Sequence, residues 1–154
     1  MSVPVDPDME SVAGILIVDA STEDLPITWA SPGFEIVTGY GAIEVLGRNP
    51  RLLQGPDTDP RAVAALRQAI AEGHDSYSTL LNYRADGTPF WNELSISPQR
   101  DKHGTIISWI AAIRDVTDRM RTAAKMHELA FYDQLTGLVN HHPLYDCLLY
   151  PSDA

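Results

Sequence analysis

Hydrophobic and polar residues are patterned as β-strands along five stretches of the chain. Two stretches are short apolar runs near the N-terminus, Ile15–Val18 and Ile27–Ala30. The other three are longer and are separated only by the turn-forming sequences ADGT and DKHG: Ser76–Tyr83, Pro89–Arg100 and Thr105–Asp115. Connections this short join neighbouring antiparallel strands, so the three long stretches are predicted to pair side by side.

Helical signals lie between the short and the long strands. Ser31-Pro32 has the form of an N-cap followed by the first residue of a helix. The sequence after it, GFEIVTGYGAIEVLG, predicts two short helices broken at the central GYG. Asp59-Pro60 begins a longer helix that ends at Gly73. The apolar face of this helix consists of Val63, Leu66 and Ile70.

Beyond Thr117 the apolar residues recur at spacings of three and four, which predicts a connector helix over residues 118–132. The apolar stripe is narrow, as is typical of an exposed connector or of a coiled coil in a homodimer. Its members are Met120, Ala123, Ala124, His127, Ala130 and Phe131.

The order of these elements predicts an α+β fold in which helices cover one face of a five-stranded antiparallel sheet. A pocket is expected between the helices and the concave face of the sheet. Residues 1–11 are expected to form a loose tail or a short cap, and the domain is expected to span residues 12–117.

The charge of the chain narrows the range of its partners. The sequence has 21 acidic and 11 basic residues, a formal net charge of −10. Nucleic acid and anionic membranes need a basic surface, so neither is expected as a partner. The acidic N-terminus lacks the pattern of a signal peptide, and no apolar run has the length of a membrane span. Together with a single cysteine, Cys147, these features predict a cytoplasmic protein.

Amide side chains interrupt the apolar pattern where a pocket is expected; they are Asn49, Gln54, Asn82 and Asn92. The simplest interpretation is that they cap turns or face solvent. Four amides together with Arg51 and Arg67 also suit a flat ligand with a polar edge, because an amide both donates and accepts. A flavin ring has such an edge, and the two arginines could hold its terminal phosphate.

Three stretches carry a specific resemblance: GRNPRLLQGPDTDP, LLNYRADGTPFWNELSISPQRDKHG and IRDVT. In order and spacing they resemble the light-oxygen-voltage (LOV) domains of the PAS superfamily, over about residues 12–117. Members of this family bind FMN non-covalently in the dark, and blue light joins a cysteine thiol to the flavin ring. The resemblance therefore implies a PAS fold with FMN as the cofactor.

The resemblance also implies roles for individual residues. Those implied to bind the ring and the ribityl chain are Asn49, Gln54, Asn82 and Asn92. Arg51 and Arg67 would bind the phosphate. The apolar walls would consist of Leu53, Val63, Leu66, Ile70, Leu94, Ile96 and Trp109.

Two departures from the family pattern affect the expected photochemistry. The reactive cysteine of the family motif GRNCRFLQG corresponds to Pro50, and the glutamine that precedes RDVT corresponds to Ile113. Proline has no nucleophile and isoleucine cannot exchange hydrogen bonds with the ring, so cysteinyl-adduct photochemistry is not expected. Val18 and Leu25 replace the threonine and asparagine that relatives often carry, and they make the pocket more apolar.

The stretch LAFYDQLTGLVN, residues 129–140, resembles the opening of the GGDEF diguanylate cyclase domain. This implies a diguanylate cyclase output domain in a parent protein, with residues 133–154 as its truncated start. The signature turn of that family is absent from the chain, so no enzymatic activity is expected. His141 and His142 are adjacent and have no third ligand nearby, so no metal site is expected.

Two functions remain open from the sequence. The first is a flavin-binding sensory module that signals without cysteinyl-adduct chemistry. The second is a flavin-free PAS dimerisation or interaction module with a degenerate pocket. The amides and the arginine pair favour the first, whereas the apolar residues at positions 18, 25, 50 and 113 favour the second.

Overall fold

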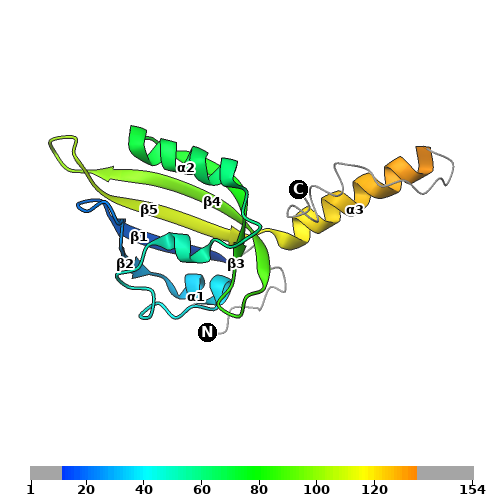
Figure 1. Cartoon of the computed structure of the whole chain (residues 1–154), viewed down its shortest axis with the longest axis horizontal. Coiled ribbons are helices and arrows are strands. Elements are labelled where there is room, and N and C mark those ends of the chain that lie inside the picture. The colour runs from blue at the N-terminus through cyan, green and yellow to red at the C-terminus, as the bar shows by residue number, and fades with distance from the viewer. Residues whose placement is uncertain (1–11, 135–154) are drawn as a thin grey trace, which may run out of the picture.

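A computed structural model describes residues 12–134 of the chain, with side chains described up to residue 127. Its sheet is antiparallel throughout and has the strand order β2-β1-β5-β4-β3 (Figure 1). The five strands are β1 (Ala13–Asp19), β2 (Ile27–Ala30), β3 (Ser76–Tyr83), β4 (Pro89–Arg100) and β5 (Ile106–Asp115). The predicted α+β fold with a five-stranded antiparallel sheet is confirmed.

The helices in the described part of the chain are α1 (Pro32–Thr38), the 3-10 helix η2 (Pro50–Leu53), α2 (Pro60–Glu72) and α3 (Thr117–Gln134). The predicted caps are present. The Ser31 hydroxyl accepts a hydrogen bond from the Phe34 N–H at 3.2 Å, and Asp59 caps α2 in the same way. Gly73 ends α2 with a φ of 75°, a left-handed conformation that glycine adopts without strain.

One helical prediction is wrong. Of the two short helices expected over GFEIVTGYGAIEVLG, the first is α1, but the second is a series of turns over residues 42–47. The segment lies between two glycines and its backbone makes bonds of the i to i+3 type, such as Leu46 N–H to Ile43 O at 3.3 Å. Val45 is nevertheless completely buried, so the segment contributes to the core without forming a helix. The helix η2 was not predicted.

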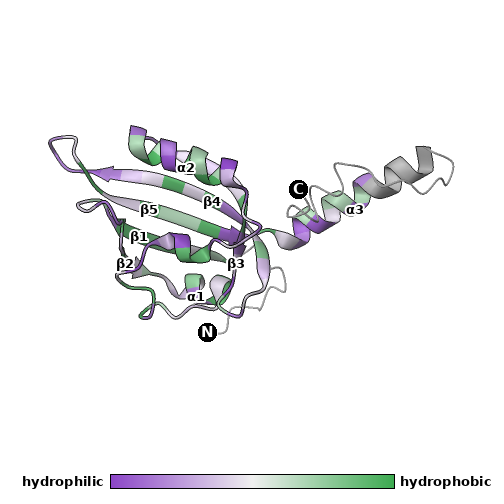
Figure 2. Ribbon diagram, viewed as in Figure 1, coloured by the Kyte–Doolittle hydropathy of each residue, from purple (hydrophilic) through white to green (hydrophobic). Residues whose placement is uncertain are grey.

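The core lies between the helices and one face of the sheet. Phe34 and Val37 of α1 are fully buried against β1 and β5. This contact depends on two glycines, because a Cβ added to Gly33 would lie 2.1 Å from the Ala13 carbonyl oxygen. A Cβ on Gly14 would lie 2.8 Å from the Phe34 Cα. Helix α2 alternates hydrophobic and hydrophilic segments along its length, as expected of a helix with one buried face (Figure 2).

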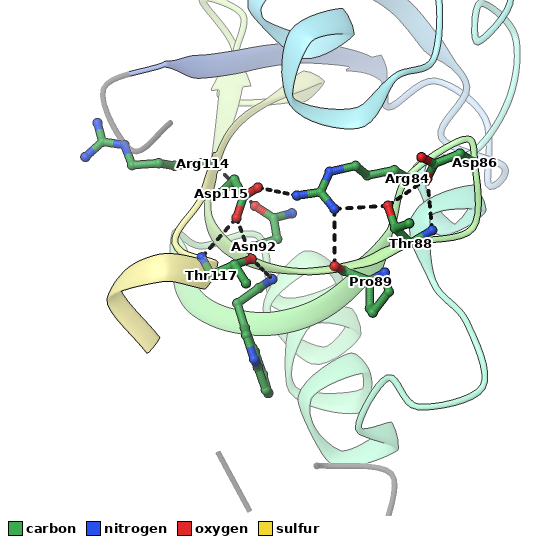
Figure 3. A network of polar contacts seen from close by, with 9 residues as sticks. Arg84, Asp86, Thr88, Pro89, Asn92, Arg114, Asp115 and Thr117 are labelled. Carbon is green, nitrogen blue, oxygen red and sulfur yellow. Dashed lines mark hydrogen bonds and ion pairs between the residues drawn. The ribbon is translucent and has the colours of Figure 1, made fainter. Parts of the chain in front are cut away.

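The corner where β5 passes into α3 is held by a polar network (Figure 3). Asp115, 5% exposed, forms an ion pair with Arg84 at the end of β3. The same carboxylate accepts hydrogen bonds from the N–H and the hydroxyl of Thr117. The Thr117 hydroxyl oxygen in turn accepts from the Trp91 N–H at 2.9 Å. The corner thus ties the β3–β4 hairpin to the first residue of α3, which projects away from the sheet (Figure 1).

Candidate functional site

A cavity of about 700 Å³ lies between the sheet, η2, α2 and the β1–β2 loop. This volume is within the usual range for small-molecule sites. All residues predicted to bind a cofactor line this one cavity: Asn49, Arg51, Leu53, Gln54, Val63, Leu66, Arg67, Ile70, Asn82, Asn92, Leu94, Ile96 and Trp109. Pro50 and Ile113 line it as well. The structure thus brings the predicted set together, while the role of each residue in binding a ligand stays a prediction.

Two buried amides form the polar part of the cavity wall. Asn82 of β3 is 4% exposed and Asn92 of β4 is 1% exposed. The Asn92 amide nitrogen donates to the Asn82 carbonyl oxygen at 2.8 Å, and the Asn92 oxygen accepts from the Arg114 N–H at 3.2 Å. The Asn82 nitrogen donates to the Leu81 carbonyl oxygen at 3.1 Å. Each amide nitrogen has two N–H groups, so each keeps one donor for a ligand.

Two arginines stand at the mouth of the cavity. Arg51 comes from η2 and Arg67 from α2, and both side chains are exposed. Neither guanidinium has a hydrogen bond or ion pair with any residue in the described part of the chain. Two unpaired guanidinium groups on one rim form a site for an anion, because each presents several N–H donors in a planar fork.

Asn49 caps a turn of the chain, as the simplest interpretation of the amides expected. Its carbonyl oxygen accepts from the Arg51 N–H at 2.8 Å and so caps η2. Its amide nitrogen donates to the Asp24 carbonyl oxygen, which ties η2 to the β1–β2 loop. Only one N–H therefore remains for a ligand. Gln54 ends η2 and lines the cavity, and its side-chain amide has no partner among residues 12–134.

The adjacent part of the same sheet is apolar. It is formed by alternate residues of β1 and β5, which point to the same face of the sheet. Among them, Ile113 is 1% exposed and Trp109 is 4% exposed. Val18, 6% exposed, completes this side, and Leu25 of the β1–β2 loop extends it toward the mouth.

A tyrosine positions the segment between η2 and α2. The Tyr83 hydroxyl oxygen accepts from the Asp57 N–H at 3.1 Å, and burial raises the pKa of this hydroxyl. Gly55 lies directly on the Tyr83 ring, where a Cβ would come within 2.2 Å of a ring carbon. Thr58 donates its hydroxyl to the Leu81 carbonyl oxygen at 2.6 Å. These contacts tie the segment between the two arginine-bearing helices to β3.

Several lining residues were missed from the sequence, namely Leu16, Thr22, Glu23, Ala71, Leu80 and Ala111. Leu16, Leu80 and Ala111 lie two residues from Val18, Asn82 and Trp109 respectively, so strand periodicity could have identified them. Thr22 and Glu23 lie in a loop, where no periodic signal exists.

The lining chemistry suits binding. It contains no cysteine, serine, histidine or lysine, and its one acid, Glu23, is exposed at the rim. Its one hydroxyl, that of Thr22, is exposed on the same loop. Within residues 12–127, no three His, Cys, Asp or Glu side chains come together as a metal site would require. Among the helices described, none has the length and apolar composition needed to cross a membrane.

Comparisons with known proteins agree with this geometry. The profile of the PAS domain matches residues 12–118. Phototropin-2 of Oryza sativa subsp. japonica is 50% identical over 95 residues, which are 62% of this chain and 10% of that protein. The light-state structure of the blue-light photoreceptor Aureochrome1 LOV is 47% identical, with a TM-score of 0.67 over 69% of this chain and 83% of that one. A structure of a light-oxygen-voltage domain, from work with a flavin analogue, is 41% identical. Its TM-score is 0.68, and the match covers 78% of this chain and 90% of that one.

Proposed function

The chain belongs to the PAS domain family and, within it, to the light-oxygen-voltage domains, and from this we propose that it binds FMN as a sensory module. The observation that carries the proposal is the cavity of about 700 Å³, with a buried amide pair on one wall and two unpaired arginines at its mouth. The named flavin and blue-light relatives support the same cofactor.

The residues present fit FMN in chemistry and in arrangement. The free N–H donors of Asn82 and Asn92, with the amide of Gln54, suit the polar edge of the flavin ring. The apolar side chains of β5 and α2 suit the two faces of the ring. Arg51 and Arg67 would hold the phosphate, whose two charges need local compensation in a chain of net charge −10.

We further propose that the module works without cysteinyl-adduct photochemistry. Pro50 supplies no thiol, and no cysteine occurs among the lining residues. Ile113, near the C-terminal end of β5, has no group that can exchange hydrogen bonds with a ligand. A bound flavin would supply blue-light absorption and electron acceptance, and the chain would respond to these.

Absorption spectroscopy of the purified protein tests the proposal. We expect a structured flavin band in the blue, either as isolated or after incubation with FMN, and lasting fluorescence under blue light. A protein that stays colourless in excess FMN would contradict FMN binding. It would favour the alternative, a flavin-free PAS interaction module, which the apolar residues Pro50, Val18, Leu25 and Ile113 support.

The proposed output is a cytoplasmic, non-enzymatic signal passed through α3 to a diguanylate cyclase domain. The sequence signal for that domain, residues 129–140, begins within α3 and continues beyond the described residues. The side chains of Ala130 and Phe131 also lie outside the described part. The chain spans about a tenth of the length of Phototropin-2, so its output is proposed from its own sequence. Nucleic acid and membranes remain excluded from the proposed partners because of the acidic charge.

We propose that α3 also forms the homodimer contact, through Ala123 of the predicted stripe and the nearby Met126, which lies outside that stripe. Ala124 is completely buried within one copy of the chain, whereas Ala123 and Met126 are exposed, Met126 by 64%. Met126→Glu should therefore shift a dimer to a monomer by light scattering, and Lys125→Glu serves as the control for added negative charge. A dimer unaffected by Met126→Glu would place the interface elsewhere.

A further inference from the structure

One residue of the cavity wall has an unusual backbone conformation. Leu25 has a φ of +49°, and it is the one non-glycine residue with positive φ in the described part of the chain. This conformation brings Cβ close to the neighbouring carbonyl oxygen, so it is unfavourable for leucine. Pro26 follows directly, and a residue before proline is itself restricted to extended conformations. Leu25 is therefore strained on two counts.

Hydrogen bonds on both sides of Leu25 hold the strained conformation. On the N-terminal side, the Asp24 carbonyl oxygen accepts from the Asn49 amide of the cap of η2. On the C-terminal side, the Pro26 carbonyl oxygen accepts from the Asp19 N–H at 2.9 Å. Strain of this kind persists only where surrounding contacts impose it, and it is concentrated at functional sites.

The leucine side chain lines the cavity and also packs against the hydrophobic core. Leu25 is half-buried and lines the cavity, while its loop neighbours Thr22 and Glu23 are exposed on the rim. The loop faces η2, which contributes Pro50 and Arg51 to the same lining. An apolar side chain thus lies at the boundary between the cavity and solvent.

We propose that Leu25 is the residue that limits access to the cavity. Its strained backbone keeps the side chain over the opening, and an occupant leaves only when the β1–β2 loop moves. For FMN this rests on the function proposed above, but the access role applies to any aromatic molecule in the cavity. Because the loop is tied to η2 by Asn49, entry and exit are coupled to the helix that carries Arg51.

The first test isolates the backbone strain in the ligand-free protein. Leu25→Gly and Leu25→Ala both remove the side chain, but only glycine adopts a positive φ without cost. We expect the melting temperature of Leu25→Gly to exceed that of Leu25→Ala by about 3 °C or more. At an unstrained position the alanine variant is the more stable of the two. An equal or higher melting temperature for Leu25→Ala would therefore contradict the inference that the backbone at Leu25 is strained.

The second test measures release. The aromatic dye 1-anilinonaphthalene-8-sulfonate and FMN are each loaded into wild type and variants, and their loss after dilution is followed by stopped-flow fluorescence. Both Leu25 variants should release either probe about tenfold faster than wild type, since removal of the side chain removes the barrier that limits exit. Leu46→Ala is the matched control, because Leu46 is a half-exposed leucine outside the cavity lining.

The two proposals fail in distinguishable ways. If wild type binds the dye and not FMN, and the Leu25 variants release the dye faster, the access role stands and the flavin function fails. If FMN binds and both variants release it at the wild-type rate, the flavin function stands and the access role fails. If neither probe binds, both fail.

Discussion

The cavity and the corner between β5 and α3 both bury polar side chains, but they satisfy them differently. At the corner, Asp115 has an ion pair with Arg84 and two hydrogen bonds from Thr117. The buried carboxylate thus finds all of these partners within the chain. In the cavity, the buried amides keep unused donors and the two rim arginines have no partner among the described residues.

This difference separates residues that hold the fold from residues that await a ligand. A buried charge whose partners all come from the chain serves stability. If one partner is removed, the other stays buried with nothing to compensate for its lost hydration. Unused donors around a cavity serve a molecule that supplies the missing acceptors. Changes at the corner should therefore alter the free energy of unfolding, and changes at the rim should alter ligand affinity.

The largest effect is expected at the corner. Arg84→Ala leaves Asp115 buried without its counter-ion and should lower the free energy of unfolding by about 3 kcal/mol, measured by urea denaturation. Arg61→Ala is the control, because its pair with Asp59 is exposed, with 93% and 46% of the two side chains accessible. We expect a loss below about 1 kcal/mol there. Similar losses in both variants would remove the distinction between corner and surface.

Substitutions of the two rim arginines should change ligand affinity and leave the free energy of unfolding almost unchanged. Replacing both Arg51 and Arg67 with alanine should weaken FMN binding by about 10-fold to 100-fold, because charge-assisted hydrogen bonds to the phosphate are lost. Riboflavin, which has no phosphate, should bind almost as before, and the free energy of unfolding should change by less than about 0.5 kcal/mol. Arg61→Ala again serves as the control on α2. Equal losses for FMN and riboflavin would mean that the arginines support only the fold.

A smaller energetic change should follow substitution at Pro50. Pro50→Cys removes the rigid ring at the start of η2 and should cost about 0.5–1 kcal/mol of stability. In the FMN-loaded protein, blue light should then bleach the flavin band, and the band should return in the dark. Pro50→Ser is the matched control, with a hydroxyl in place of the thiol and no bleaching. If flavin-loaded Pro50→Cys does not bleach, more than the thiol distinguishes this cavity from those of its relatives.

The smallest effect concerns pH at the outer face of the sheet. Hydrogen bonds from Tyr77 and Arg119, both 2.6 Å, lower the pKa of Glu93 below its usual 4.5. A lowered folded-state pKa stabilises the protein above pH 4.5, and this contribution is lost as pH falls through the folded-state value. The melting temperature of wild type should therefore be higher than that of Glu93→Gln at pH 7. In acid the two melting temperatures should become equal. Arg119→Ala should be intermediate, and a difference independent of pH would argue against the assignment.

Much of the sheet could be predicted from sequence because strand periodicity and turn residues are local properties. The caps at Ser31 and Asp59 were predicted for the same reason. The segment 42–47 was mispredicted because its apolar Val45 is buried without a helix, which only tertiary packing determines.

The residues that line the cavity could be predicted from the sequence more fully than its geometry. Every residue that the resemblance implied does line it, but the hydrogen bond from Asn49 to the β1–β2 loop and the rim position of Glu23 depend on how that loop meets η2. The strain at Leu25 had only an indirect sequence signal, because relatives often carry asparagine at this position and asparagine adopts positive φ more readily than leucine.

The corner also fixes the rotational orientation in which α3 begins. Since Thr117 is fixed to Asp115 by two hydrogen bonds, α3 begins at a defined angle about its own axis. Each residue of an α-helix turns its direction by about 100° and advances it by about 1.5 Å. A domain joined rigidly beyond α3 would rotate by about 100° for each residue inserted, and seven insertions would return it to within about 20° of its first orientation. Signal strength in fusions to this module should therefore vary with linker length with the helical period of about 3.6 residues, two periods of which are about seven residues.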